Sequence, residues 1–280
     1  MHRTVRHVKV IQPPSLSLRE LRQGLVGLRD YGDLLKTLSA HRINVRYKQS
    51  LLGFAWAVLQ PLSLMLIYTL VFSVIAKVSS GAIPYAVFAY AALLPWTFFS
   101  TALTNATNGL VSHAHLVTKV YFPREILPLS YVLAALFDLA IASTVMAGLM
   151  FYYRVPVTVQ VLWLVPIVAV LATFVTGVSL IFSATQVRFR DIGMAMPLLM
   201  QLWMFASPVV YPLDQVPARF RAFYDLNPMV GIIESFRRVS VLGTPPDGRL
   251  LGLAAVVSFT LLPLAYAYFK KVEATVADVI

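Results

Sequence analysis

An uncharged run of 28 residues, from Gln49 to Ala76, is the feature that most constrains how this chain can fold. A helix needs about 20 apolar residues to cross the ~30 Å hydrocarbon core of a bilayer. The run follows the basic, polar junction Arg46-Tyr47-Lys48 and ends before Lys77. We therefore expect the chain to enter a membrane at this junction.

The composition of the whole chain fits that expectation. Of its 280 residues, 59% are hydrophobic and 12% are charged, whereas a soluble domain carries about 25% charged residues. The net charge is +11, and Lys and Arg gather in the cytoplasmic loops of membrane proteins. We expect no nucleic-acid binding, because no soluble basic domain remains once the apolar segments are set aside. The absence of cysteine excludes disulfides and thiolate chemistry.

Charged residues divide the chain into six apolar blocks, each long enough to span a bilayer. The blocks are Leu51–Ala76, the stretches between Lys77 and Lys119 and between Glu125 and Arg154, Val155–Val187, the stretch between Asp191 and Asp214, and Leu250–Phe269. The predicted fold class is therefore all-α: a polytopic membrane protein with six transmembrane helices within residues 51–271.

Six spans place both termini on the same side. With a cytoplasmic N-terminus, the inside segments hold sixteen Lys and Arg and the outside segments hold seven, which fits the positive-inside rule. We expect residues 1–30 to form a peripheral cytoplasmic segment and 272–280 a cytoplasmic tail.

Two segments outside these spans have amphipathic patterns. Residues 31–50 predict an interfacial helix that leaves Arg42, Arg46 and Lys48 available to lipid phosphates; an ordinary basic flank is the alternative. Within 213–242, the stretches Val216–Tyr224 and Pro228–Leu242 are too short and too charged to span. They suit two re-entrant helices in the outer leaflet, and the alternative is a folded external loop.

The motifs of enzyme chemistry are missing from the sequence. It contains no GxxxxGK[ST] sequence to cradle ATP phosphates, no HExxH, no GxSxG and no clustered aspartates. We therefore predict no catalytic residue, no metal site and no cofactor in this chain.

A short charged loop between the second and third blocks is a candidate docking element. Pro123 suits the start of a helix, and Glu125 near that start favours the helix dipole. The alternative to docking is a capped turn. For docking, exposed Val120, Tyr121 and Phe122 would fit a cleft on a partner. The candidate residues are Lys119, Val120, Tyr121, Phe122, Pro123, Arg124 and Glu125.

Asp138 lies near the middle of the third block, where a charge costs roughly 2.5–3.5 kcal/mol. It must pair, become protonated or face a polar cavity. We favour a structural or cavity-facing role over proton coupling, because no other acidic residue or His partner is evident at mid-span.

Most aromatic residues near the span ends suit the interfacial belt of a membrane protein. A minority would line a conduit, because sugar rings stack on aromatic faces. The candidates for channel or sugar contact are Trp56, Tyr68, Phe72, Tyr90, Trp96 and Phe137.

Four motifs, in matching order from about residue 30 onward, resemble the type-2 ABC exporter permeases of bacterial surface polysaccharides, the membrane subunits of O-antigen and teichoic-acid exporters. The motifs are Arg46–Trp56, Lys119–Pro128, Asn227-Pro228-Met229, and Val272-Glu273 with Ala277–Ile280.

The resemblance implies a homodimer in the bacterial cytoplasmic (inner) membrane. Two copies of a separate ATPase subunit would bind ATP and Mg, and the substrate would be a glycan on a polyprenyl-pyrophosphate or related lipid carrier. The family's coupling helix maps onto about His113–Arg124, its gate helix onto 31–50 and its re-entrant helices onto 213–242. From charge and depth, we expect Arg42, Arg46 and Lys48 to meet the lipid head group.

Two other functions remain open from the residues. The same architecture also exports small lipids or drugs. An integral-membrane enzyme acting on polyprenyl-linked sugars would use the same lipid, but it needs clustered carboxylates or a metal site.

Overall fold

The computed structural model describes residues 30–279 apart from 49–51, 54, 78–82 and 121, with side chains as far as Glu273. The described residues form helices and no strand, which confirms the all-α class. The predicted N-terminal segment lies outside the described residues, apart from Asp30.

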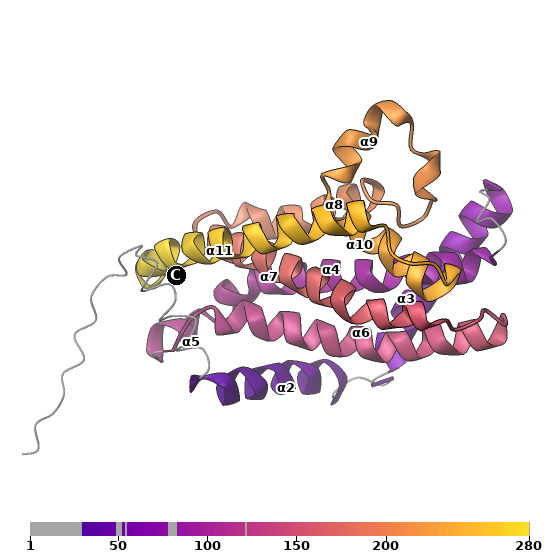
Figure 1. Ribbon diagram of the computed structural model, residues 1–280. Helices are drawn as coiled ribbons and strands as arrows, with labels where there is room; N and C mark the ends of the chain where they lie inside the picture. The colour runs from indigo at the N-terminus through magenta and orange to yellow at the C-terminus, as the bar shows by residue number, and fades with distance from the viewer. Residues whose placement is uncertain (1–29, 49–51, 54, 78–82, 121, 280) are drawn as a thin grey trace, which may run out of the picture.

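Among the described residues, five helical segments are long and apolar enough to cross a membrane, so the chain is a multi-pass membrane protein (Figure 1). They are α3 (Ala55–Tyr68) with the π-helix η1 (Thr69–Ile75), α4 (Tyr85–Ser112), α6 (Ile126–Tyr152), η2 (Val159–Trp163) with α7 (Leu164–Arg188), and α11 (Gly248–Val279).

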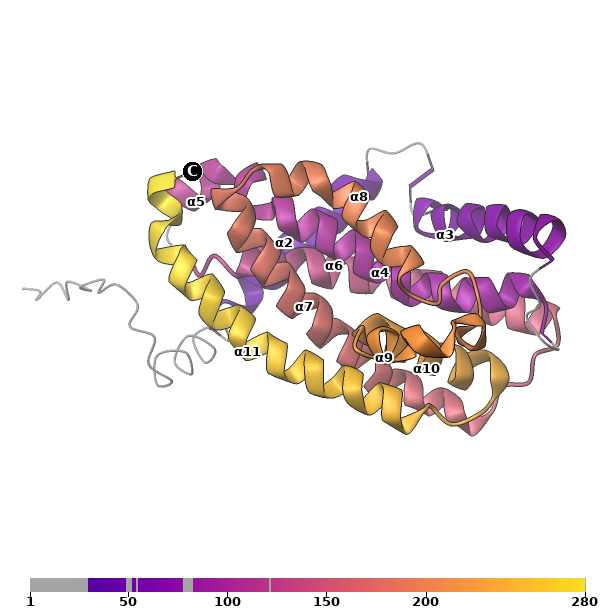
Figure 2. The same ribbon diagram turned by 90° about the horizontal axis from the view of Figure 1, so that it is seen from above.

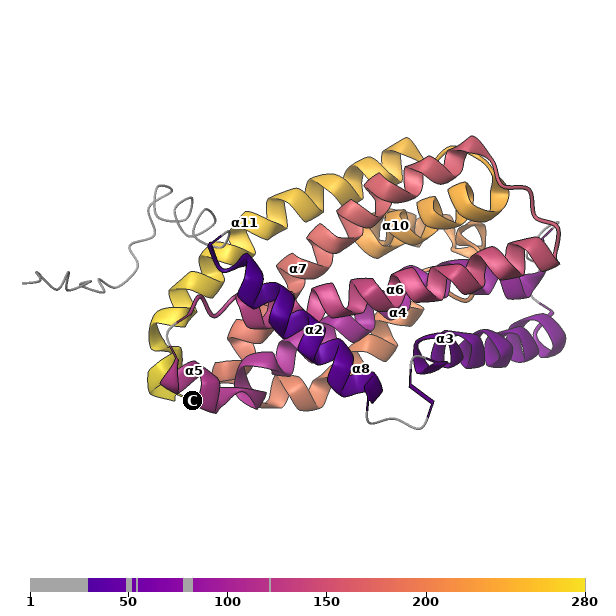
Figure 3. The same ribbon diagram turned by 90° about the horizontal axis from the view of Figure 1, so that it is seen from below.

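Shorter elements connect these spans or lie beside them. They are α2 (Gly32–Lys48), α5 (Ala114–Lys119), α8 (Asp191–Phe205), η3 (Leu213–Gln215), α9 (Ala218–Asp225), α10 (Pro228–Arg237) and η4 (Arg238–Leu242). Figure 3 shows α2 crossing the outer face of α6, against which it packs.

The fifth apolar block of the sequence forms α8, which has 15 residues. At 1.5 Å per residue, α8 is about 22 Å long, less than the ~30 Å hydrocarbon core. It runs back from the end of the bundle where α7 finishes, as Figure 2 shows. The count of six spans therefore stays a prediction.

Helix α4 occupies the centre of the bundle. Of the residues in the apolar part of α4, 83% are buried inside the structure. In the span Ala55–Ile75 the corresponding share is 11%. Helix α4 packs against α3, α6, α7, α8 and α10. A helix that is apolar on all sides needs neighbours on all sides, and every residue from Tyr85 to Trp96 is buried.

The predicted stretch Pro228–Leu242 forms α10 and η4, and Val216–Tyr224 corresponds to α9. Asn227 caps α10 by accepting a hydrogen bond from the Met229 amide at 3.1 Å. Arg237, 1% exposed, donates to the Pro208 carbonyl at 2.8 Å and lies over the Phe88 ring. These contacts hold α10 inside the bundle, whereas α9 has no buried residue.

At Gly231 the backbone of α10 lies close to that of α11, since a Cβ built there would lie 2.4 Å from the Leu250 carbonyl oxygen. We expect Gly231→Ala to lower the free energy of unfolding by about 1–3 kcal/mol, because the Leu250 backbone must move. Thermal unfolding in detergent measures the change.

Gly252→Ala is the matched control, because a Cβ at Gly252 meets nothing within 4 Å. It should be neutral or stabilise α11 by about 0.5–1 kcal/mol, as Ala is the better helix former. Equal unfolding temperatures for the two variants would contradict the close packing of α10 on α11.

Candidate functional site

Two clusters of polar side chains connect segments that do not span the membrane to the spanning helices through hydrogen bonds and ion pairs. The first, which we name the loop clamp, consists of Arg124, Glu125, Tyr266, Lys270 and Glu273. The second, the α2–α6 cluster, consists of Arg42, Arg46, Tyr47, Ser130 and Asp138.

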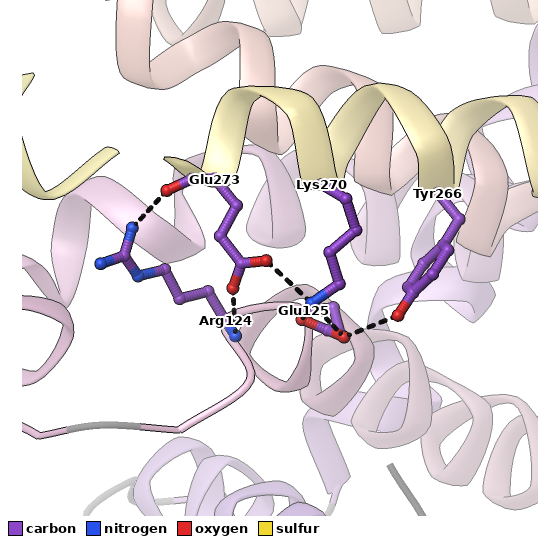
Figure 4. A network of polar contacts seen from close by, with 5 residues as sticks. All are labelled: Arg124, Glu125, Tyr266, Lys270 and Glu273. Carbon is purple, nitrogen blue, oxygen red and sulfur yellow. Dashed lines mark hydrogen bonds and ion pairs between the residues drawn. The ribbon is translucent and has the colours of Figure 1, made fainter. Parts of the chain in front are cut away.

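Lys270 is at the centre of the loop clamp (Figure 4). Its ammonium lies 2.8 Å from a carboxylate oxygen of Glu125 and 2.8 Å from one of Glu273. The Tyr266 hydroxyl donates to Glu125 at 3.1 Å. Tyr266, Lys270 and Glu273 are spaced four and three residues apart, so they share one face of α11.

Arg124 joins the loop itself to the clamp. Its backbone N–H donates to the Glu273 carboxylate at 3.2 Å, and its guanidinium donates to the Glu273 carbonyl at 2.7 Å. The residues that begin α6 are thus tied to the last turns of α11, which packs along α7.

Glu125 is 1% exposed and stands at the N-cap of α6. Burial raises the pKa of its carboxyl group, the nearby Glu273 charge adds to the rise, and Lys270 opposes it. The Lys270 ammonium group therefore forms ion pairs with the carboxylates of both Glu125 and Glu273. Removing it leaves Glu125 as a buried charge without its cation.

Fewer residues of the predicted docking surface are exposed in the structure than we expected from the sequence. Lys119 and Val120 are exposed, but the expectation of an exposed Phe122 is wrong: its side chain is 6% exposed. Phe122 belongs to an apolar cluster with residues of α7 and α11, which gives its ring a more favourable environment than water. Pro123 and Arg124 are half-buried, and Tyr121 lies outside the described residues.

Asp138 is paired and lies in the wall of a cavity, as expected for a carboxylate at this depth. It forms an ion pair with Arg46 and accepts a hydrogen bond from the Tyr47 hydroxyl at 2.5 Å. Tyr47 is 4% exposed between α2 and α6.

Arg42 also turns toward α6, where it donates to the Ser130 hydroxyl at 2.6 Å and lies 3.4 Å from the centre of the Tyr131 ring. The expectation that Arg42 faces lipid phosphates is therefore wrong for this position of its side chain, whereas Arg46 is paired with Asp138 but lies in the wall of a cavity, so its contact with the lipid head group stays a prediction. The guanidinium groups of Arg42 and Arg46 gain from ring stacking and charge pairing with residues about ninety positions away, which a local pattern does not reveal. Lys48 is exposed.

A cavity of about 520 Å³ lies between α2, α3, α4, α6 and α8, with Arg46 and Asp138 in its wall. Five polar residues of α4 line it at helical spacing, and our sequence reasoning missed them. They are Thr97, Ser100, Thr101, Thr104 and Asn105. Their i, i+3, i+4, i+7, i+8 spacing is a readable signal of one polar helix face within an uncharged span.

Among the aromatic residues proposed as channel or sugar contacts, Trp56 lines this cavity and is 51% exposed. The assignment of Tyr90 and Trp96 as such contacts is wrong in this structure, because both are buried; the Tyr90 hydroxyl donates to the Ala142 carbonyl at 3.0 Å. Tyr68 and Phe72 are not fully buried and form an edge-on pair, and Phe137 is 41% exposed, so their role stays a prediction.

Comparisons with known proteins give one consistent group. The model of the ABC-2 type transporter family matches residues 33–240. The O-antigen export system permease protein RfbA of Myxococcus xanthus is 32% identical over 246 residues, which are 87% of this chain and 94% of that protein. RfbA of Klebsiella pneumoniae is 28% identical, over 89% and 95%. The polysialic acid transport protein KpsM of Escherichia coli is 23% identical, over 85% and 93%.

We expect Lys270→Met to lower the free energy of unfolding by about 3–5 kcal/mol, because it leaves Glu125 buried without its cation. Adding Glu125→Gln should recover part of that loss, since the neutral amide no longer needs one. Thermal unfolding in detergent measures all variants.

Lys271→Met is the control, since Lys271 is exposed on the adjacent position of α11. This variant should have the same unfolding temperature as the wild type. A Lys270→Met variant as stable as Lys271→Met would refute the role of the loop clamp.

Proposed function

The chain belongs to the ABC-2 type transporter family, and we propose that it is the membrane subunit of an ATP-driven exporter that moves a lipid-linked polysaccharide across the membrane. One observation carries this proposal: the relatives named for O-antigen export and polysialic acid transport align over nearly their whole length. The match therefore covers nearly the whole length of each relative and is not limited to a shared fragment.

Energy would come from a separate ATPase subunit, present in two copies, which binds ATP and Mg. The absence of a GxxxxGK[ST] sequence from this chain supports ATP binding by a separate subunit. The surface for the ATPase would be α5 with the exposed side chains of Lys119 and Val120. Behind that surface, the loop clamp would transmit a push on the loop to α11.

The complex would be a homodimer of this chain in the bacterial inner membrane, with both termini cytoplasmic. The excess of Lys and Arg in the segments assigned to the inside supports that orientation. Figure 1 supports a common side, since α5, the beginning of α2 and the C-terminal part of α11 lie at one end of the bundle. The exposed apolar face of α3 and η1, including Leu66, Leu70 and Val74, suits contact with lipid or a second copy.

The substrate would be a glycan on a polyprenyl pyrophosphate or a related lipid. The lipid would arrive beside α2, where Lys48 is exposed and Arg46 lies in the cavity wall. The resulting path leads from the interfacial helix to the polar face of α4.

The test of this function is co-expression with a candidate ATPase subunit from the same organism, followed by an ATPase assay of the purified complex with and without lipid-linked glycans. We expect the two chains to purify together and the glycan lipid to stimulate hydrolysis. Stimulation by small lipids or drugs and not by glycan lipids would refute the polysaccharide substrate.

The docking surface gives a sharper prediction. Lys119→Glu combined with Val120→Asp should reduce recovery of the ATPase subunit at least about tenfold, because charge and apolar contact are lost together at an exposed interface. Affinity co-purification measures the loss. Val157→Asp is the control and should leave recovery unchanged, because Val157 is exposed in the segment that follows α6, and α6 ends at the opposite end of the bundle from α5 (Figure 1). Equal recovery with all variants would refute the docking assignment.

A further inference from the structure

The cavity contains one cation and one anion among its described lining residues, and they are paired with each other. Arg46 and Asp138 form that pair, with side chains 34% and 18% exposed. The Arg46 guanidinium therefore remains accessible from the cavity. Asp138 lies deeper and occupies the position that an external anion would take beside Arg46.

The remaining polar groups of the wall suit a ligand rich in hydroxyl groups. Within the described part of the chain, no hydrogen bond involves the side chains of Gln60, Thr101 or Asn105, all of which line the cavity. The Thr97 hydroxyl donates to carbonyls of its own helix at 2.8 and 3.1 Å, which leaves its lone pairs to accept from a ligand.

Trp56 adds a flat, half-exposed aromatic surface to the same wall. The cavity thus combines amide and hydroxyl groups with an aromatic ring, beside a single guanidinium. Its volume of about 520 Å³ lies within the range of small-ligand sites, about 300–1,000 Å³. A sugar linked to a phosphate matches each of these groups.

We propose that this cavity binds the phosphate and the first sugar of the lipid-linked substrate, and that the ligand phosphate replaces Asp138 as the partner of Arg46. The proposal rests on the function proposed above and names the binding site for its substrate. Phosphate is the stronger partner, because it carries more charge and presents several oxygens to the planar guanidinium.

The hydrogen bond from Tyr47 makes the exchange feasible. When Arg46 turns to the phosphate, the Tyr47 hydroxyl still donates to the Asp138 carboxylate at 2.5 Å, so the carboxylate keeps a partner within the span. Arg42 keeps its own contacts with Ser130 and Tyr131, so α2 stays attached to α6 while Arg46 changes partner.

Asp138 is then a competitor built into the site, and removing its charge should strengthen binding. The full-length chain in phosphatidylcholine nanodiscs is titrated with radiolabelled polyprenyl pyrophosphate carrying one N-acetylhexosamine, with binding followed by scintillation proximity. We expect Asp138→Asn, which still accepts from Tyr47, to bind about fivefold tighter, the effect of removing a partly exposed competing charge. Arg46→Gln should bind at least about tenfold weaker. Unchanged or weaker binding by Asp138→Asn overturns the exchange.

A second pair of variants keeps the proposal testable if the charge variants fold poorly. Thr101→Val should weaken binding of the sugar-bearing probe severalfold and leave binding of bare polyprenyl pyrophosphate unchanged. Thr173→Val on α7 removes a matched hydroxyl outside the cavity and should affect neither probe. Equal affinities of Thr101→Val and wild type for the sugar-bearing probe overturn the sugar site.

A competition arm separates the lipid-linked sugar from ordinary phospholipid head groups. Phosphatidylglycerol nanodiscs should leave most of the probe bound; displacement equal to that by unlabelled probe overturns specificity for the lipid-linked sugar.

These binding measurements need no ATPase partner. If the complex exports glycan while Asp138→Asn binds no tighter, this inference fails and the proposed function stands. If the binding results hold while no ATPase co-purifies, the proposed function fails instead.

Discussion

The burial of α4 is the constraint on which the remaining helices depend. Because no residue from Tyr85 to Trp96 is exposed, α3, α6, α7 and α10 must each present an apolar face to this segment. From Thr97 onward, the same helix carries half-buried hydroxyl and amide groups on one face. One half of α4 therefore forms the centre of the bundle, while the polar face of the other half forms a cavity wall at the same side as α2.

Ion pairs then attach the segments that do not span. A charge inside an apolar bundle costs several kcal/mol unless it is paired, so each pair specifies where its segment must lie. Asp138 holds the end of α2 through Arg46, and Glu125 holds the last turns of α11 through Lys270. Both anions are on or next to α6, which makes that helix the common support of α2 and of the segment between α5 and α6.

The sequence predicted those features that depend on composition along the chain. The long uncharged runs predicted the spanning helices, and Pro228 after Asn227 correctly marked the start of α10. Features that depend on distant partners were not predictable in this way. The side chains of Arg42 and Phe122 point inward because of residues far along the chain, and buried Tyr90 has the same local pattern as an aromatic residue that faces lipid. Hydrophobicity cannot separate these environments, because lipid and protein interior are similarly apolar.

The wall of the cavity that has the fewest packing neighbours is the wall whose movement would most easily change the size of the cavity. Helix α3 supplies Trp56 and Gln60 to the cavity, yet its span is only 11% buried and it continues as the π-helix η1. Pro61 lies inside α3, where it removes a backbone hydrogen bond and weakens the helix beside the cavity. The α4 side of the cavity is fixed by packing on several neighbours. Within this chain, displacement of α3 would widen the cavity at the cost of few packed contacts, whereas displacement of α4 would expose the centre of the bundle.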